Sequence, residues 1–199
     1  MKNPLVLLAI ALSFTSCTDL LLTAYGVKAP QIESYTSLSY YASQKGLNMA
    51  GRLCAPKDST QLYHLFEISS VPDALIFNDK GQFVNYRETP ESCNSSIDGF
   101  IEGLAHNDSL QANDTILAHD LLKRLVMLPN KESISFDNSY DYTIIMTWLK
   151  WTGRTTPNHI IPWQAAIAKA EKDGLSIRTL YLNLDFMDFM GFENEPEVK

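Results

Sequence analysis

Apolar and polar residues alternate along this chain with periods that predict both helices and strands. A helical period runs from Glu33 to Lys45 and stops at Gly46. Met49 to Ala55 is predicted as a short strand, and Asp58-Ser59 is expected to open a second helix. The first part of the chain therefore predicts alternating helix and strand.

The stretch from Ser70 to Tyr86 combines an X-Pro bond, two strand-like runs and a tight turn. Ala74 to Phe77 is apolar, Asp79-Lys80-Gly81 can supply a turn residue with positive φ, and Gln82 to Tyr86 alternates polar and apolar side chains. This order predicts a β-hairpin directly after Pro72.

Two helices are expected after the hairpin. Ser96 to Leu104 places its apolar residues on one face, which could cover the hairpin. Asp114-Thr115 is expected to cap a further helix over residues 114–128, which Pro129-Asn130 would end. Residues 106–113 between them are polar and are predicted to be an exposed joint.

The last third of the chain predicts a β-α-β unit. Tyr142 to Trp148 is rich in β-branched and aromatic residues, Ile160 to Asp173 is an amphipathic helix that Gly174 ends, and Ile177 to Leu184 is a second strand. Both strands are almost continuously apolar, which favours parallel neighbours that are joined by a right-handed crossover helix.

These segments resemble the two halves of the thioredoxin fold, in the reverse order. The proline, hairpin and helix of residues 72–104 resemble the second half, in which the proline is cis. Tyr142 to Trp148 with Trp151-Thr152-Gly153 resembles the first half, in which a strand meets the redox loop. The resemblance implies a circularly permuted α/β domain, a thioredoxin-like three-layer α/β/α sandwich with a mixed sheet, in which residues 141–185 dock beside residues 72–104 and the helix 114–128 joins the halves.

A second layout stays open. Residues 20–104 could form a complete thioredoxin-like unit, with Tyr25 to Pro30 at the position of the redox loop and the β-α-β unit as an appendage. The two layouts differ in whether the strand 142–148 lies in the same sheet as the hairpin.

The N-terminus predicts export. Met1-Lys2-Asn3 carries a positive charge, Leu5 to Leu12 is unbroken apolar sequence, and small residues precede Cys17. This resembles a bacterial lipoprotein processing site, which implies a lipid on Cys17. Phe14 stands where leucine is usual, so ordinary cleavage with a free Cys17 stays open.

We therefore expect a signal peptide at 1–16, a lipid-anchored tether at 17–30, a single domain at 31–192 and an acidic tail at 193–199. Thr18 is not acidic, which favours the outer membrane, with the domain facing the periplasm. The 23 Asp and Glu residues against 16 Lys and Arg argue against nucleic acid as a partner, so membrane contact is expected through the lipid on Cys17.

The redox chemistry of the family does not carry over. The loop Thr152 to Pro157 contains no sulfur, and neither does Gly26 to Pro30, so the thiol pair has no counterpart. Cys54 and Cys93 are the remaining candidate thiols. They could form a disulfide or stay unpaired, and Cys93 is the better candidate for reactivity because it precedes a helix start.

What the resemblance leaves is a peptide-binding surface. It implies a binding groove formed by Val71, Pro72, Trp151, Thr152, Gly153, Arg154 and Thr155. We expect a redox-inactive binding module for an envelope protein or peptide. Alternatives are a thiol-disulfide oxidoreductase that uses Cys54 and Cys93, or a purely structural envelope protein.

No cofactor or metal is expected, because the four histidines lie far apart in the sequence without ligand spacing. Asp185, Asp188 and Glu193 lie near the acidic tail, and we expect them to solvate the C-terminal segment and not to bind calcium.

Overall fold

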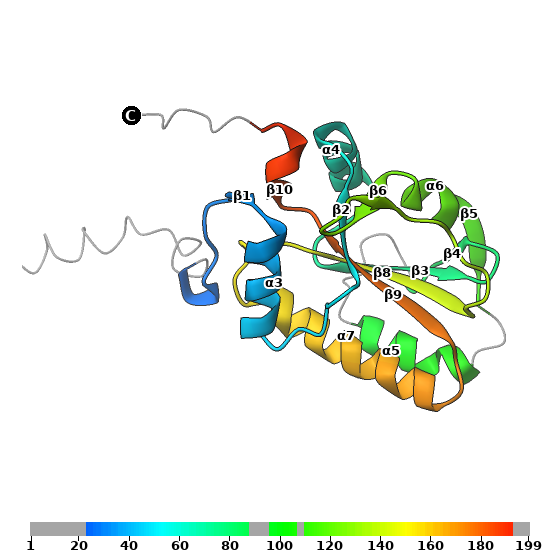
Figure 1. Ribbon diagram of the computed structural model, residues 1–199. Helices are drawn as coiled ribbons and strands as arrows, with labels where there is room; N and C mark the ends of the chain where they lie inside the picture. The colour runs from blue at the N-terminus through cyan, green and yellow to red at the C-terminus, as the bar shows by residue number, and fades with distance from the viewer. Residues whose placement is uncertain (1–22, 88–95, 107–109, 193–199) are drawn as a thin grey trace, which may run out of the picture.

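An eight-stranded mixed sheet forms the centre of the protein (Figure 1). The computed structural model describes residues 23–87, 96–106 and 110–192. The strands are β2 (Leu53–Pro56), β3 (Asp73–Asn78), β4 (Gln82–Val84), β5 (Ala112–Leu117), β6 (Leu125–Met127), β7 (Glu132–Ser133), β8 (Tyr142–Trp148) and β9 (Ile177–Asn183). Their order across the sheet is β5-β4-β3-β8-β9-β2-β6-β7.

The middle of the sheet joins the hairpin to the β-α-β unit. β8 pairs in parallel with β9, from Tyr142 opposite Ile177 to Trp148 opposite Asn183. On its other side β8 pairs antiparallel with β3, where Asp73 lies opposite Thr147. The prediction that the strand 142–148 lies beside the hairpin in one sheet is therefore confirmed.

The alternative layout is wrong. β2 and β3 are not neighbours, because β8 and β9 lie between them. The described part of residues 20–104 therefore forms no complete sheet of its own, and the later strands β8 and β9 are central to the fold.

Helices cover both faces of the sheet. They are α3 (Tyr35–Gln44), α4 (Ser59–Ile68), α5 (Ile97–Gly103), α6 (Ala118–Leu122) and α7 (Thr155–Lys172), with 3₁₀ turns at Leu104–His106 and Asp188–Met190. Figure 1 shows α5 and α7 side by side below the sheet and α4 and α6 above it. The protein is thus a mixed α/β structure with helices on either side of a curled sheet.

Several helix predictions are confirmed. Asp58 caps α4 by accepting a hydrogen bond from Gln61 N at 2.8 Å. α3 ends just before Gly46, whose φ is +69°. α7 begins at Thr155, earlier than predicted, because Pro157 is tolerated in the first helical turn, where no intrahelical N–H bond is required.

The predicted helix over 114–128 is wrong. Residues 112–117 form β5, which pairs with β4, and Leu125–Met127 forms β6, which pairs with β2. Only Ala118–Leu122 between them is helical. The apolar spacing fits a helix, but pairing with distant strands satisfies the backbone of both flanks instead.

The two ends of the described chain meet in a second, small sheet. β1 (Ile32–Glu33) pairs in parallel with β10 (Phe186–Met187). Glu33 was predicted to begin a helix and lies in this strand instead. The peptide bond Val71–Pro72 is cis, as expected, and so is Leu128–Pro129. The predicted signal peptide, Cys17, Cys93 and the tail 193–199 lie outside the described residues.

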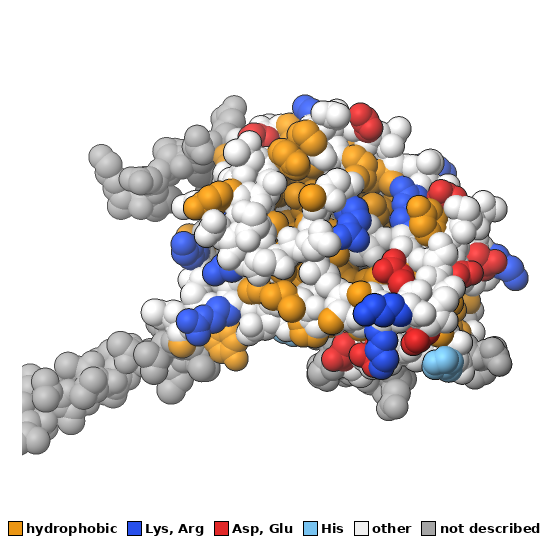
Figure 2. Space-filling view, turned by 60° about the horizontal axis from the view of Figure 1, so that its bottom comes forward, with side chains coloured by type: hydrophobic (Ala, Val, Ile, Leu, Met, Phe, Trp, Pro, Cys, Tyr) orange, Lys and Arg blue, Asp and Glu red, His pale blue; other side chains and the backbone are white. Residues whose placement is uncertain are grey.

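Exposed apolar side chains do not mark a site by themselves. On the face that Figure 2 shows, hydrophobic side chains reach the surface at several places among charged ones. Tyr40 and Tyr63 are large side chains that are more than half exposed, at 67% and 58%. Scattered exposure of this kind is normal for a protein surface.

Candidate functional site

The carboxyl ends of β8 and β9 lie at one edge of the sheet. β8 ends at Trp148 directly beside the end of β9 at Asn183, and Leu184 N donates to Trp148 O at 3.0 Å. In α/β sheets, ligand sites form preferentially outside the carboxyl ends of parallel strands. Five of the predicted groove residues, Trp151 to Thr155, follow β8 at this edge.

Two buried carboxylates flank Lys150 at this edge. Asp185 and Glu33 are only 2% and 5% exposed. Asp185 Oδ2 accepts hydrogen bonds from Lys150 N at 2.8 Å and Asn183 Nδ2 at 2.7 Å. Lys150 Nζ lies 2.5 Å from Glu33 Oε2, which also accepts from Ser37 Oγ. Lys150 therefore links the two acids, through its backbone to one and its ammonium group to the other.

Burial changes the titration of this site. It raises the pKa of Asp185 to about 6, and the nearby charge of Glu33 acts in the same direction, whereas bonds from Lys150 and Asn183 oppose it. The expectation that Asp185 solvates the C-terminal segment is thus wrong. Its Oδ1 and Trp148 Nε1 are buried without a hydrogen-bond partner among the described residues.

A tyrosine connects this cluster to the loop that follows β8. Tyr41 stacks on Trp148, with ring centroids 6.0 Å apart and planes 9° from parallel. Its hydroxyl donates to Gly153 O at 3.0 Å. Burial, together with the charge of Asp185, raises the pKa of Tyr41 to about 12. The hydroxyl therefore stays protonated, and remains a donor, to a higher pH than that of an ordinary tyrosine.

The loop after β8 is hydrogen-bonded to the N-terminal segment of the described chain. Lys28 N donates to Trp151 O at 2.9 Å, and Arg154 N donates to Tyr25 O at 2.8 Å. Gly153 has a φ of +63°, and a Cβ at this position would overlap the carbonyl groups of Tyr25 and Gly26. The two segments that the sequence offered as alternative redox loops therefore pack against each other.

The structure places the predicted groove residues in two neighbouring loops. Trp151, Thr152, Gly153 and Thr155 are half-buried, and Arg154 is exposed. Val71 is half-buried and Pro72 is buried. Thr147 Oγ1 donates to Ser70 O at 2.8 Å and so fixes the loop before Pro72 against the end of β8.

Sequence reasoning missed Glu33, Lys150 and Asp185 as a cluster. Glu33 is more than a hundred residues from its partner Lys150, and the short pairing of β1 with β10 brings them together. A signal for Asp185 existed, because it directly follows the apolar strand β9.

Cys54 is not placed for thiol chemistry. It lies in β2, between β9 and β6, and is 0% exposed. Burial raises the pKa of its thiol far above the ordinary value, with only a small opposing effect from Arg178. Thiol-disulfide exchange at Cys54 is therefore disfavoured, and Cys93 lies outside the described residues.

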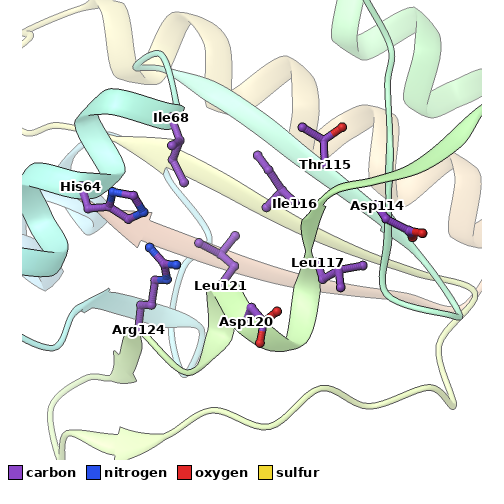
Figure 3. A pocket seen from close by; sticks show the side chains of 9 residues that line it. All are labelled: His64, Ile68, Asp114, Thr115, Ile116, Leu117, Asp120, Leu121 and Arg124. Atoms are coloured by element: carbon purple, nitrogen blue, oxygen red, sulfur yellow. The ribbon is translucent and has the colours of Figure 1, made fainter.

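A separate hollow lies on the α4 side of the sheet (Figure 3). It has a volume of about 230 Å³ and lies between α4 and the segment from β5 to Arg124. Figure 3 shows the guanidinium of Arg124 reaching toward the ring of His64. This hollow is distinct from the edge at the ends of β8 and β9.

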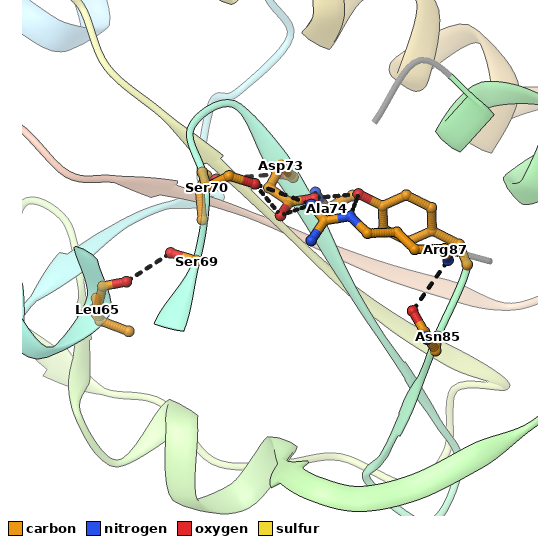
Figure 4. Close-up of polar contacts among 9 residues, drawn as sticks. Leu65, Ser69, Ser70, Asp73, Ala74, Asn85 and Arg87 are labelled. Carbon is orange, nitrogen blue, oxygen red and sulfur yellow. Dashed lines mark hydrogen bonds and ion pairs between the residues drawn. The ribbon is translucent and has the colours of Figure 1, made fainter. Parts of the chain in front are cut away.

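Asp73, the first residue of β3, is a fully bonded buried acid (Figure 4). Its carboxylate accepts from Ala74 N at 2.8 Å, Tyr86 Oη at 2.6 Å and Ser70 Oγ at 2.6 Å. Arg87 Nη2 pairs with Asp73 Oδ2 at 2.5 Å. Because its oxygens are satisfied, Asp73 is a structural anchor for the loop before β3.

Among residues 23–87, 96–106 and 110–192, no three His, Cys, Asp or Glu side chains form a group that could hold a metal ion. In the same ranges no helix has the length and apolar character to cross a membrane. The chain matches no protein-family model, no curated protein and no solved structure. The geometry itself is therefore the basis for a functional proposal.

Proposed function

We propose that this protein is a lipid-anchored lipoprotein of the bacterial cell envelope whose domain is a redox-inactive binding module. The domain is a rearranged thioredoxin-like fold, and its partner is an extended segment of an envelope protein or peptide. The lipid on Cys17 holds it at the outer membrane, with the domain in the periplasm.

The strand order supports the rearranged thioredoxin-like fold. The strand before the loop at the redox position, β8, neighbours β3, which follows the cis bond to Pro72. The crossover helix α7 and the hairpin's helix α5 pack together on one face. This neighbourhood is what the resemblance implies, with the two halves in reversed chain order.

The observation that carries the binding function is the hydrogen bonding of the loop 151–154. Trp151 O and Arg154 N bond main-chain groups of Lys28 and Tyr25. Main-chain hydrogen bonds of this kind hold peptide segments with little dependence on their sequence. The loop uses these main-chain groups to hold the chain's own residues 25–28, so a partner segment would contact the loop through its exposed side chain Arg154. The loop also lacks the sulfur that redox chemistry needs.

A capture experiment with matched variants tests the binding function. The full-length protein would be cross-linked in intact cells of its source and purified, and its partners would be identified by mass spectrometry. We expect Arg154→Glu, an exposed charge reversal at the loop, to lose a partner that the wild type retains. Lys80→Glu makes the same charge change in the exposed turn between β3 and β4 and should retain it. Equal recovery of every partner with both variants would overturn the proposal.

The anchor has its own test. Cells fed an alkyne analogue of palmitate should label the wild-type protein and not Cys17→Ser. The variant should also leave the membrane fraction. A Cys17→Ser protein that still carries the label would contradict lipidation at this residue.

A further inference from the structure

The hollow on the α4 side continues into a second, more open one. The first is lined by His64 and Ile68 of α4 and by residues 114–124, and the second, of about 570 Å³, also reaches Lys57. The two share His64, Asp120 and Arg124. Together they form one groove, which we call the α4 groove.

Two cations that line the α4 groove, Lys57 and Arg124, have side chains without a hydrogen bond or ion pair among the described residues. Asp120 is bonded to Lys123 at 3.1 Å and lies 3.3 Å from His119. Asp114 accepts a hydrogen bond from Gln82 Nε2 at 3.0 Å. The guanidinium of Arg124 makes no hydrogen bond or ion pair within the described ranges and acts on Asp120 only through its charge.

The groove therefore offers an unused set of donors for an anion. A guanidinium is always charged and presents its N–H groups in a fork that matches a carboxylate. Lys57 and Lys123, at the open end, add positive potential that attracts an anion in an otherwise acidic protein. Thr60 and Gln61 add neutral polar groups there.

The opposite wall of the first hollow is apolar. It is formed by Ile68 of α4, which is 36% exposed, together with Ile116, Leu117 and Leu121. Figure 3 shows the side chain of Leu121 beside the guanidinium of Arg124, and those of Ile68 and Ile116 farther from it. A ligand that uses the whole hollow must therefore combine an anionic head with a short apolar part.

The acids at the rim limit the charge of the ligand. Asp114 and Asp120 line the first hollow with Arg124, whereas Lys57 and Lys123 line the second, so inside the first hollow a dianion is repelled more strongly than a monoanion. This disfavours phosphate and phosphate esters.

We propose that the α4 groove binds a small monocarboxylate, whose head pairs with Arg124 and whose short aliphatic chain lies against Ile68, Ile116 and Leu121. His64, whose Nδ1 lies 3.4 Å from Glu67, presents its other ring nitrogen to the same head group. This site shares no residue with the loop 151–154, so its test is independent of the test of peptide binding.

Amide chemical shifts test this site with three probes. The full-length, ¹⁵N-labelled protein in detergent micelles would be titrated with hexanoate, hexan-1-ol and inorganic phosphate. Hexanoate should shift amides of α4 and residues 114–124 in a saturable way. Hexan-1-ol lacks the charge and phosphate lacks the chain, so each should bind at least about tenfold more weakly than hexanoate.

Two variants identify the head-group partner. Arg124→Gln should weaken hexanoate at least about tenfold, because a hydrogen bond to a charged group is lost. Lys172→Gln, an exposed charge removed at the far end of α7, should leave hexanoate affinity unchanged. Arg124→Lys retains the charge, and its affinity for hexanoate should lie between those of the wild type and Arg124→Gln. This intermediate affinity shows that the loss in Arg124→Gln is not caused by unfolding. The proposal fails if hexanoate does not shift these amides, or if hexan-1-ol or phosphate binds as tightly as hexanoate. It also fails if Arg124→Gln folds and retains the full affinity for hexanoate.

Discussion

Asp185 is an acid that the fold holds in an unfavourable environment. Its pKa is raised from 3.8 to about 6 by burial and by the charge of Glu33. Between these values the folded state holds a proton that the unfolded chain has released. Stability is therefore expected to fall as the pH rises from about 4 to about 6, by up to about 3 kcal/mol from this group alone.

Asp185→Asn removes this titration. We predict that the free energy of unfolding of the variant, minus that of the wild type, grows by about 2 to 3 kcal/mol between pH 4 and pH 7. Urea titrations at several pH values would measure it. Asp188→Asn is the control, because it makes the same chemical change at an exposed side chain close by in the sequence. The same pH dependence in both variants, or no pH dependence for Asp185→Asn, would contradict the role given to the burial of Asp185.

The thiol of Cys54 should be unreactive toward alkylating reagents in the folded protein. We predict that a Cys17→Ser, Cys93→Ser protein, in which Cys54 is the remaining thiol, resists iodoacetamide at pH 8 and reacts fully in urea. The reason is the absence of exposed surface at Cys54 and its raised pKa. Mass spectrometry would follow the modification. Labelling of the folded protein at the rate of free cysteine would contradict this assignment.

At the scale of elements, Gly153 controls the packing of the loop 151–154 on residues 25–28. We predict that Gly153→Ala increases hydrogen exchange at the amides of Lys28 and Arg154 by at least about tenfold, equivalent to about 1.4 kcal/mol of local stability. The added methyl group must displace the carbonyls of Tyr25 and Gly26.

Gly46→Ala is the matched control for Gly153→Ala. Gly46 has a similar φ of +69°, but nothing lies within 4 Å of a Cβ there. It should share the backbone cost of about 1 kcal/mol without loosening residues 25–28. Equal exchange at Lys28 in the two variants would mean that the contact does not hold this segment.

The sequence predicts best the elements whose signals are local. The cap at Asp58, the turn at Gly81 and the apolar runs of β8 and β9 each fix an element through neighbours in the chain. The helix prediction for residues 114–128 is wrong because the strands β5 and β6 are stabilised by pairing with β4 and β2, which are distant in sequence.

The candidate site was predictable only in part, for the same reason. The loop after β8 and the cis bond before β3 follow from the resemblance. The buried contact between Glu33 and Lys150 depends instead on a two-residue pairing, β1 with β10, that leaves no periodic pattern in the sequence. Short parallel contacts of this kind are visible only once the chain has folded.

At the scale of the whole molecule, one sheet ties the early and late parts of the chain together. β2, from the early part, lies between β9 and β6 of the later part, so within the described residues the main sheet is shared by both parts. We predict a single cooperative unfolding transition in which tryptophan fluorescence and far-UV circular dichroism coincide. Trp148 and Trp163 are suitable reporters because they are 0% and 3% exposed. Two separate midpoints would show that the halves unfold independently.

The hydrogen bond between Arg154 and Tyr25 also limits how far the folded domain can lie from Cys17. It pins the chain at Tyr25, so that eight peptide steps separate Cys17 from the folded body. Even a fully stretched chain of that length spans no more than about 28 Å. With Cys17 embedded in lipid as proposed, the folded domain would stay within this distance of the bilayer surface. Its binding partners would therefore also be molecules close to the membrane.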